Sequence, residues 1–533
     1  MVFRALDVLS RRAALSTAIT FAVAFAAPIV LRHYPDSWKP AIQDEFSYLL
    51  GAETFLRGRL TNPPHPMARH FESPHVLQRP TYQSKYPPAN ALFIAAGWKL
   101  GGAPAAGILL SYAFMCASIA WMLRAYIGRL LGFSLAVALA LRLADSDWAT
   151  TYWGGAVAAG AGALVLGAAA RLLRVGSIAA ARGVTRNAIV LAIGLLLLAN
   201  SRPYEGLWLS VPVMLVLGVD LWRRRHDAGR MMLRRAIAPF VVVMALGGAA
   251  MAAYNDAVTG NWMEMPYTTY TRLRGSIPLF ATEVSSPSAP HADSAKAKNA
   301  PTALAQRRAW SPRGAAVYVY FLTTLILFFV PAVALVPFLL LPLVTRDRLT
   351  RVALLAIGGT VLGMALTIWH LPHYAAPATA AILAVYGACL HLLGKLRVGG
   401  RRVGPPLVAG MLIAFALTVP WNIALSLAKG GLPPGWPTHR EIIADSLARR
   451  GKSVVFVHYA RTHPSTDEWV YNSADIDASP VVWAHDLGPE ANAELLRYYR
   501  DRLPWIVEVD QEFGPFPVRP YVGADSAQAG GHP

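Results

Sequence analysis

The feature that most constrains this chain is a series of long apolar runs, which recurs from residue 13 to residue 424. A transmembrane helix needs about 20 predominantly apolar residues. Eleven segments qualify, some only with generous boundaries: 13–31, 104–123, 128–143, 154–173, 187–200, 205–221, 236–254, 316–344, 351–369, 374–394 and 404–424. The sequence therefore predicts a polytopic α-helical membrane protein with about eleven transmembrane helices.

Composition agrees with a membrane protein. Hydrophobic residues make up 55% of the 533 residues and charged residues only 15%, whereas soluble domains carry about 25% charged residues. The formal net charge of +19 does not indicate a nucleic-acid partner, because the basic residues lie between the apolar runs. Cys116 and Cys389 both fall inside these runs, which excludes a disulfide framework and a four-cysteine metal site.

The connections between the runs predict the orientation, because Lys and Arg collect on the cytoplasmic side of a membrane. Alternate connections are rich in basic residues: Arg4, Arg11 and Arg12; Arg124 and Arg129; Arg171, Arg174, Arg182 and Arg186; Arg223, Arg224, Arg225, Arg230, Arg234 and Arg235; Arg346, Arg348 and Arg351; Lys395, Arg397, Arg401 and Arg402. We therefore expect an integral plasma (inner) membrane protein with a cytoplasmic N-terminus and an outer C-terminus. An alternative for residues 1–31 is a cleaved signal peptide, since Ala24-Phe25-Ala26 resembles a cleavage site.

Three regions are expected outside the bilayer. Two are outer loops of a transmembrane domain that spans 1–429, namely 32–87 and 255–313, and the stretch 285–301 within the second loop is expected to be mobile. The third region, 430–533, is predicted to be a small α/β domain outside the cytoplasm. Its helices are expected at Arg440–Arg450 and Glu490–Arg502, and its strands at Ser453–Tyr459, Val481–Ala484 and Trp505–Asp510.

The first outer loop contains two motifs that can carry chemistry. Asp44-Glu45 lies about a dozen residues after the first run, at the start of an amphipathic helix expected along the outer membrane surface. A purely structural alternative is that Asp44 caps this helix and that the helix dipole favours Glu45. Further along, Lys85-Tyr86-Pro87-Pro88 precedes an apolar helix that begins at the prolines. Lys85 is placed either to hold a lipid phosphate or to extend towards the membrane surface without a specific ligand.

With these motifs and this topology, the chain resembles the GT-C superfamily of polyprenyl-phosphate-dependent glycosyltransferases. The nearest branches look like the protein O-mannosyltransferases and the bacterial lipid A aminoarabinose transferases, which carry an acidic pair after the first span and a later Lys-Pro-Pro or Tyr-Pro-Pro element. The resemblance implies transfer of a sugar from a polyprenyl-phosphate-linked donor to an acceptor at the outer face of the membrane. It implies that Asp44 is the catalytic base, and Glu45 is expected to orient the acceptor. Because the leaving group is a phosphate, cations beside it would replace an acid catalyst.

Further site residues are expected on other outer turns. In 143–155, Asp145 or Asp147 with Trp148 and Tyr152 suits an acceptor or sugar, although an interfacial aromatic belt would have the same composition. Lipid-phosphate contacts are expected from Lys85 and Tyr86 and from a second group on later turns, Arg202, His373 and Tyr374. Structural alternatives here are an Arg202–Glu205 pair that closes its turn and a capped turn around His373.

No metal site or other cofactor is predicted. His65, His70 and His75 lie near Glu72, but their five-residue spacing fits no single helix face and prolines interrupt it. The lipid-linked donor is a substrate, and the acceptor is left open among protein, lipid and polysaccharide. Two alternative functions are a transporter or lipid flippase and a non-catalytic glycan-binding scaffold. The informative charges lie at outer turns and the two halves of the chain do not match, which argues against transport.

Overall fold

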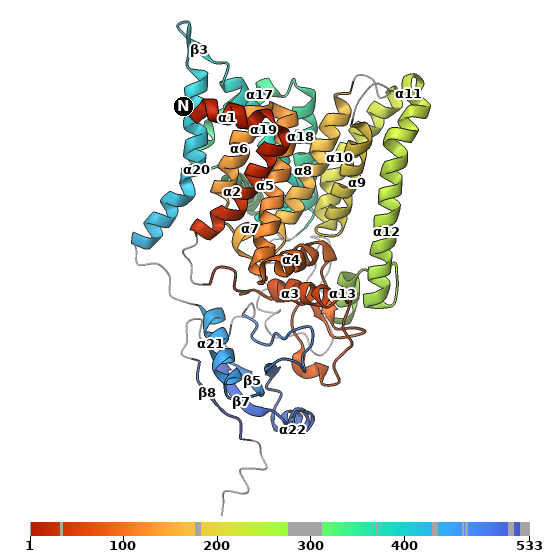
Figure 1. Ribbon diagram of the computed structural model, residues 1–533, viewed down its shortest axis with the longest axis vertical. Helices are drawn as coiled ribbons and strands as arrows, with labels where there is room; N and C mark the ends of the chain where they lie inside the picture. Colours follow the sequence, from red (N-terminus) through yellow and green to blue (C-terminus); the bar gives the residue numbers. More distant parts are fainter. Residues whose placement is uncertain are drawn as a thin grey trace, which may run out of the picture.

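The protein is described from a computed structural model, which covers residues 2–31, 36–175, 183–274, 312–367, 371–428, 435–460, 463, 467–509 and 516–522. A helical bundle forms one end of the molecule and a small domain with a sheet forms the other, with short helices between them (Figure 1). The stretch 285–301 and the predicted boundary after residue 429 lie outside the described residues.

Eight described helices are long and apolar enough to cross a membrane. They are α2 (Ala13–Leu31), α5 (Ala105–Ile127), α8 (Gly155–Leu173), α10 (Pro203–Arg223), α12 (Ala238–Thr259), α18 (Arg348–Ala365), α19 (Thr379–Leu393) and α20 (Gly404–Ala428). The apolar stretch of α12 extends back to Arg230, and that of α19 extends back to His373 through η5 (Pro372–Ala378).

The other three predicted spans are helical, but none of them is a single helix that is long and apolar enough to cross a membrane. Residues 316–344 fold as α16 (Pro312–Phe329), η3 (Ala332–Ala334), η4 (Val336–Leu340) and α17 (Leu341–Val344), and this pair of segments is bent by 83°. The remaining two are α6 (Arg129–Arg142) and α9 (Val184–Ala199), with 14 and 16 residues. The predicted fold class is confirmed, whereas the count of eleven spans is not.

The bundle packs around α8, whose sequence GAVAAGAGALVLGAAARLL is almost entirely small or apolar. In a lipid bilayer the hydrophobic effect does not drive helices together, so small residues stabilise the bundle by letting neighbouring helices pack closely. A Cβ added to Gly160 would lie 2.5 Å from the ring of Phe114, and one added to Gly167 would lie 2.4 Å from the ring of Trp121. Helix α8 therefore packs against the aromatic face of α5.

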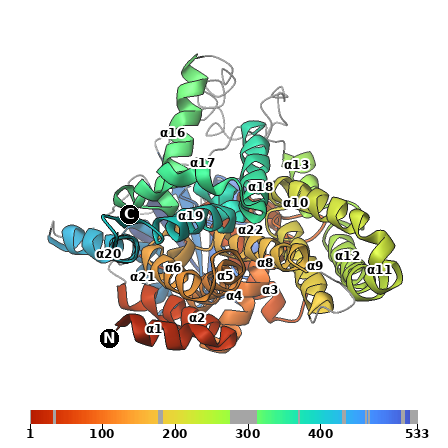
Figure 2. The same ribbon diagram turned by 90° about the horizontal axis from the view of Figure 1, so that it is seen from above.

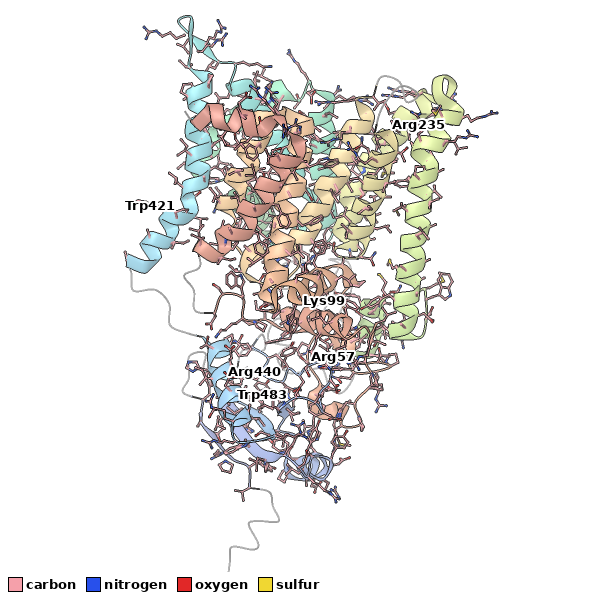
Figure 3. All side chains as sticks on the ribbon, viewed as in Figure 1. Arg57, Lys99, Arg235, Trp421, Arg440 and Trp483 are labelled. Atoms are coloured by element: carbon pink, nitrogen blue, oxygen red, sulfur yellow. The ribbon has the colours of Figure 1, made fainter. Side chains whose placement is uncertain are left out.

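Most connections that are rich in arginine lie at the end of the bundle opposite the C-terminal domain (Figure 1). This end carries α1 (Val2–Arg11), α11 (Arg225–Met232), the π-helical turn η2 (Leu233–Ile237) and the hairpin of β3 (Arg397–Val398) and β4 (Arg401–Arg402). Figure 3 shows Arg235 there. We call it the arginine end.

Short elements lie between the bundle and the C-terminal domain. They are α3 (Gln43–Leu56), η1 (Ala68–Phe71), β1 (Val76–Leu77), β2 (Gln83–Ser84), α4 (Pro88–Gly101), α7 (Asp147–Thr150) and α13 (Pro266–Arg274). As predicted, α4 begins at the second proline of the motif, because proline is favoured at the first helical position. Figure 2 shows this layer and the bundle from above.

The C-terminal domain is an α/β unit, as predicted. Its sheet has the order β6-β5-β7-β8, in which β5 (Ser453–Tyr459) pairs in parallel with β6 (Val481–His485) and β7 (Leu503–Val509), and β8 (Val518–Pro520) pairs antiparallel with β7. Its helices are α21 (Trp436–Ala448) and α22 (Pro489–Tyr498). In this domain the Arg440 guanidinium lies 4.4 Å from the Trp483 ring centroid (Figure 3).

Candidate active site

Asp44 lies in the first turn of α3, facing residues from elsewhere in the first outer loop. The hydroxyl of Tyr86 donates a hydrogen bond to Asp44 Oδ1, and His75 Nε2 lies 3.4 Å from the same oxygen. The Asp44 side chain is 37% exposed, so a small molecule can reach it. Partial removal from water raises the pKa of Asp44, while the positive charges of Lys85 and Arg202 lower it.

Glu45 has a different environment. It is 1% exposed, and its Oε2 accepts hydrogen bonds from the backbone N–H groups of Ala41 (2.8 Å) and Ile42 (3.1 Å). Its Oε1 accepts the backbone N–H of Tyr152 at 2.9 Å. Burial raises the pKa of Glu45 to about 7, although these N–H groups favour the ionised form. The N-cap residue of α3 is Ile42, so the structural alternative that Asp44 caps this helix is wrong.

Lys85 lies among aromatic rings. The residue is 6% exposed, and its Nζ lies 5.1, 4.7 and 4.8 Å from the ring centroids of Tyr86, Tyr267 and Tyr270. A cation over aromatic faces is stabilised by their quadrupoles. Tyr86 contacts this ammonium group and the carboxylate of Asp44, so the two charges are close neighbours. Lys85 therefore does not extend freely along the membrane surface.

Arg202 brings a second cation towards Asp44 from the turn before α10. Its guanidinium lies 4.9 Å from the Tyr374 ring centroid, and Nη2 lies 3.4 Å from the carbonyl oxygen of Trp153. Within the described chain, no carboxylate lies within 4.0 Å of Arg202, so the alternative of a closed Arg202–Glu205 ion pair is not observed. His373 stands between Trp153 and Tyr374, at 5.0 and 4.5 Å between ring centroids.

The aromatic outer turn at 143–155 mainly packs. Trp148 is 3% exposed and lies against Phe328 and Phe329 at 5.2 and 5.4 Å between ring centroids. Tyr152 is 2% exposed, and its hydroxyl donates to the carbonyl of Trp38 at 2.9 Å. Neither ring lines an open surface, so the geometry favours a packing role over sugar stacking for both.

The two aspartates of this turn are more accessible. Asp147 is the first residue of α7 and is exposed, while Asp145 is half-buried. Through the hydrogen bond between Tyr152 and Glu45, the turn is tied to α3. A contact of Asp145 or Asp147 with a sugar therefore stays a prediction.

The three histidines of the first outer loop have separate partners. His65 Nε2 lies 3.0 Å from Asp477 Oδ1, whereas the ring nitrogens of His70 face the carbonyl oxygens of His485 and Ala491. Over the described ranges, no group of three or more His, Cys, Asp or Glu residues could hold a metal ion. His75 instead lies beside Asp44, a position that the spacing of the histidines in the sequence does not predict.

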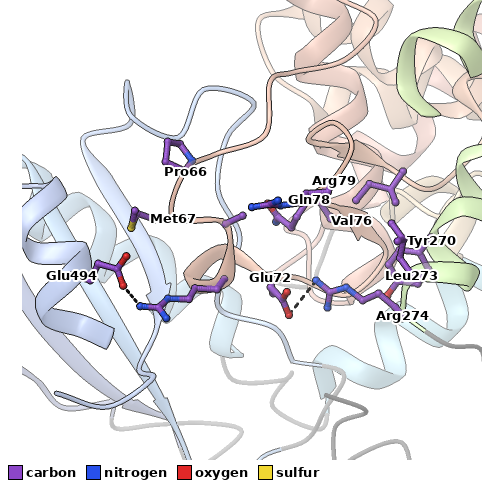
Figure 4. Close-up of a pocket in the computed structure, with 13 residues that line it drawn as sticks. Pro66, Met67, Glu72, Val76, Gln78, Arg79, Tyr270, Leu273, Arg274 and Glu494 are labelled. Atoms are coloured by element: carbon purple, nitrogen blue, oxygen red, sulfur yellow. Dashed lines mark hydrogen bonds and ion pairs between the residues drawn. The ribbon is translucent and has the colours of Figure 1, made fainter. Parts of the chain in front are cut away.

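A cavity of about 430 Å³ opens beside this site on the side of the C-terminal domain (Figure 4). It lies between η1, β1, α13 and α22, and Tyr270 belongs both to its wall and to the ring group around Lys85. Two ion pairs span it: Arg69 with Glu494, and Arg274 with Glu72 at 3.3 Å. Arg79 is an exposed third arginine on the wall.

The sequence does not predict that the rings of Tyr267 and Tyr270 lie beside Lys85. They lie on α13, about 180 residues from Lys85, and the only signal is an aromatic segment, PYTTYTRLR, in the second outer loop. Electrostatic interactions connect Tyr267 with Asp44 and Arg202. The structure thus gathers Asp44, Lys85 and Arg202, with aromatic neighbours, from separate parts of the chain.

No protein-family model and no curated protein sequence matches this chain. Among solved structures, ArnT from Cupriavidus metallidurans bound to undecaprenyl phosphate aligns with a TM-score of 0.51 and 13% identity, over 93% of this chain and 92% of that chain. ArnT in the apo state aligns over the same shares with a TM-score of 0.47 and 13% identity. The oligosaccharyltransferase AglB from Archaeoglobus fulgidus, in complex with an inhibitory peptide and a dolichol-phosphate, gives 0.44 and 11% identity over 92% of this chain and 69% of that chain. The likeness to the first of these shows that the chain has the GT-C fold that its motifs and topology predict.

Proposed function

We propose that this chain is an integral membrane glycosyltransferase. It transfers a sugar from a polyprenyl-phosphate-linked donor to an acceptor hydroxyl at the outer face of the membrane. The observation that carries the proposal is the convergence of one accessible carboxylate, Asp44, with two cations, Lys85 and Arg202, next to the membrane-spanning bundle. The likeness to ArnT bound to undecaprenyl phosphate supports a lipid-linked donor.

The arginine end faces the cytoplasm in this proposal, and the C-terminal domain lies outside, in the plasma (inner) membrane. The excess of arginine at the opposite end from Asp44 supports this orientation. The site then lies at the level where a lipid phosphate meets water, which is where the donor presents its sugar.

Asp44 acts as the general base. Its carboxylate takes the proton of the acceptor hydroxyl while the acceptor oxygen attacks the anomeric carbon of the sugar. The bond from that carbon to the phosphate oxygen breaks, and its electron pair stays on the phosphate. Lys85 and Arg202 stabilise the charge that grows there, Arg through several N–H donors. Tyr86, His373 and Tyr374 line the phosphate side, and Asp145 or Asp147 contacts the sugar or acceptor.

Glu45 positions the base in this mechanism and does not orient the acceptor as expected from the sequence, because the residue is only 1% exposed. Both of its oxygens accept backbone N–H groups, so it holds the start of α3 and the turn at Tyr152 in place. The acceptor enters through the cavity beside Tyr270, because that cavity opens outwards next to the Lys85 rings. Protein, lipid and polysaccharide acceptors all remain compatible with this route.

Asp44→Asn tests the proposal. The variant keeps the size of the side chain but removes the base, so we expect transfer to fall at least about a hundredfold. Mass spectrometry of outer-face glycans, in cells with the wild type, the variant or no copy of the protein, measures the product. Asp256→Asn is the matched control, since Asp256 is exposed on α12.

Retention of undecaprenyl phosphate by the purified proteins, measured by native mass spectrometry, should be similar in all of them. Near-normal transfer by Asp44→Asn would exclude Asp44 as the base. An identical glycan profile with and without the protein would contradict the glycosyltransferase proposal and favour transport or a binding scaffold.

A further inference from the structure

A second open space lies at the arginine end, far from Asp44. It is a groove of about 730 Å³ between α2, α5 and α8. Its apolar walls include Ala14, Ala18 and Phe21 of α2 and Ala117 and Trp121 of α5. Its other lining residues include three arginines, Arg124, Arg171 and Arg186. The groove therefore combines an apolar channel with a cationic group at one end.

Two of these arginines are held in place by the helices. The Arg171 guanidinium stacks 3.8 Å from the Trp121 ring centroid and donates to the carbonyl oxygens of Gly167 (2.8 Å) and Trp121 (2.7 Å). Arg124 donates to the carbonyl oxygens of Ser10 (2.5 Å) and Arg11 (3.1 Å). These contacts fix the positions of the guanidinium groups but do not neutralise their charge.

No carboxylate neutralises them within the part of the chain that the structure describes. None of the three arginines has an ion pair with Asp or Glu within 4.0 Å there. The sequence from Arg171 to Arg186 contains no acidic residue. On the adjoining helix α1, Asp7 is already paired with Arg11 at 3.0 Å and with Arg129 at 3.3 Å. Three positive charges thus border an apolar groove without an acidic partner.

We propose that this groove binds one anionic phospholipid from the leaflet at the arginine end. An acyl chain lies along the apolar wall of Phe21 and Trp121, and the phosphate lies between Arg124, Arg171 and Arg186. Guanidinium groups suit phosphate because their N–H donors match its oxygens, and basic pockets between transmembrane helices are known sites for anionic head groups. A zwitterionic head group is disfavoured, because its own cation would face the three arginines.

Native mass spectrometry of the purified full chain tests this lipid site. The protein is titrated with dioleoyl phosphatidylglycerol or dioleoyl phosphatidylcholine, which share their acyl chains and differ in head-group charge. We expect one phosphatidylglycerol to be retained at least about tenfold more tightly than phosphatidylcholine. The variant Arg124→Gln/Arg171→Gln/Arg186→Gln should lose this preference. Arg397→Gln/Arg401→Gln/Arg402→Gln removes three exposed arginines from the hairpin at the same end and should keep it.

Arg186→Glu alone provides a variant with little risk to folding, since Arg186 is exposed. Its preference for phosphatidylglycerol should fall several-fold with an unchanged size-exclusion profile. Equal retention of both lipids by the wild type would overturn the proposal. So would a loss of preference in the hairpin variant as large as in the groove variant, which would indicate only a general attraction to this end. Displacement of the lipid by millimolar inorganic phosphate would show an anion site without a lipid chain and would also overturn it.

Discussion

Removal of the Lys85 charge should move the pH dependence of transfer in a defined direction. If Asp44 is the base, as we propose, it can accept a proton only when it is ionised, so activity should fall as the pH drops through its pKa. Lys85 and Arg202 favour the ionised form, against the effect of burial. In Lys85→Gln one of these charges is lost, the pKa of Asp44 rises, and the acid limb of kcat/KM moves to higher pH.

The size of this movement follows from the contacts around Tyr86. Lys85 Nζ is 5.1 Å from the Tyr86 ring centroid, and the hydroxyl of that ring bonds to Asp44. This arrangement places the two charges about 8 Å apart, where an effective dielectric constant of about 20 gives about 2 kcal/mol. Because Asp44 is partly exposed and salt screens the pair, we expect the acid limb to move by about one pH unit.

The assay measures kcat/KM as a function of pH, over donor concentrations that reach saturation, at low and at high salt. The plateau should fall as well, because in the proposed mechanism Lys85 also stabilises the leaving phosphate. Lys99→Gln is the control, since Lys99 is exposed at the end of α4 (Figure 3). A lower plateau with an unmoved acid limb would refute the argument that Asp44 titrates beside Lys85 as the base.

Three further predictions concern neighbouring side chains. Tyr86→Phe removes the hydrogen bond to Asp44 and should lower kcat about tenfold, which corresponds to a rise of roughly 1.4 kcal/mol in the activation free energy. Single-turnover measurements check this, and retention of the donor should change little. Glu45→Ala leaves three backbone N–H groups without their acceptor, which lowers the free energy of unfolding by about 1–3 kcal/mol for each group. Scanning fluorimetry should therefore show a far lower thermal midpoint for Glu45→Ala than for Glu45→Gln. Arg202→Lys should restore only part of the donor affinity that is lost in Arg202→Gln, because an ammonium group lacks the paired N–H donors of a guanidinium group. Equal donor affinities of the wild type and the two variants in a native mass-spectrometry titration would contradict the phosphate contact.

The fold was largely predictable because long apolar runs and proline positions act locally. Each of the eleven predicted runs folds mainly as helix in the residues that the structure describes, and Pro88 marked the start of α4. The number of spans was not predictable, because hydropathy does not report where a helix breaks. In 316–344, Pro331, Pro337 and Pro342 interrupt the apolar run, and the chain bends by 83° within it. Helix α6 has 14 residues and a length of about 21 Å, which is short of the hydrocarbon core.

The residues of the proposed site could be picked out only where they form a motif in the sequence. Asp44 and Lys85 stand in such motifs, whereas His75 and the tyrosines of α13 reach them only in the folded chain. Composition also fails to distinguish a ring that binds sugar from one that packs. Trp148 lies in an aromatic outer turn that suits a sugar site, yet its ring is buried against Phe328 and Phe329.

The position of Asp44 depends on the C-terminal domain as well as on the bundle. Phe46, two residues after Asp44, stacks on Tyr471 at 4.5 Å and lies 6.0 Å from Trp436, inside the core of that domain. Arg440 in turn holds the carbonyl oxygen of Tyr471 at 2.7 Å. One part of α3 is therefore anchored in the domain, while Glu45 ties its first turn to the bundle.

Removing the domain would expose Phe46 and loosen α3, so loss of activity in such a truncation would not identify an acceptor-binding role. Phe46→Ala keeps the cavity beside Tyr270 and disturbs only the anchor, at a cost of about 3–5 kcal/mol. If the domain mainly positions the base, this variant should lower kcat with little change in acceptor KM. If the domain acts mainly by binding the acceptor, substitution of Glu494, its residue in the cavity wall, should raise KM, and Phe46→Ala should leave kcat largely intact. The two contributions are separable because Phe46 lies in the domain core, whereas Glu494 lies on the wall of the cavity.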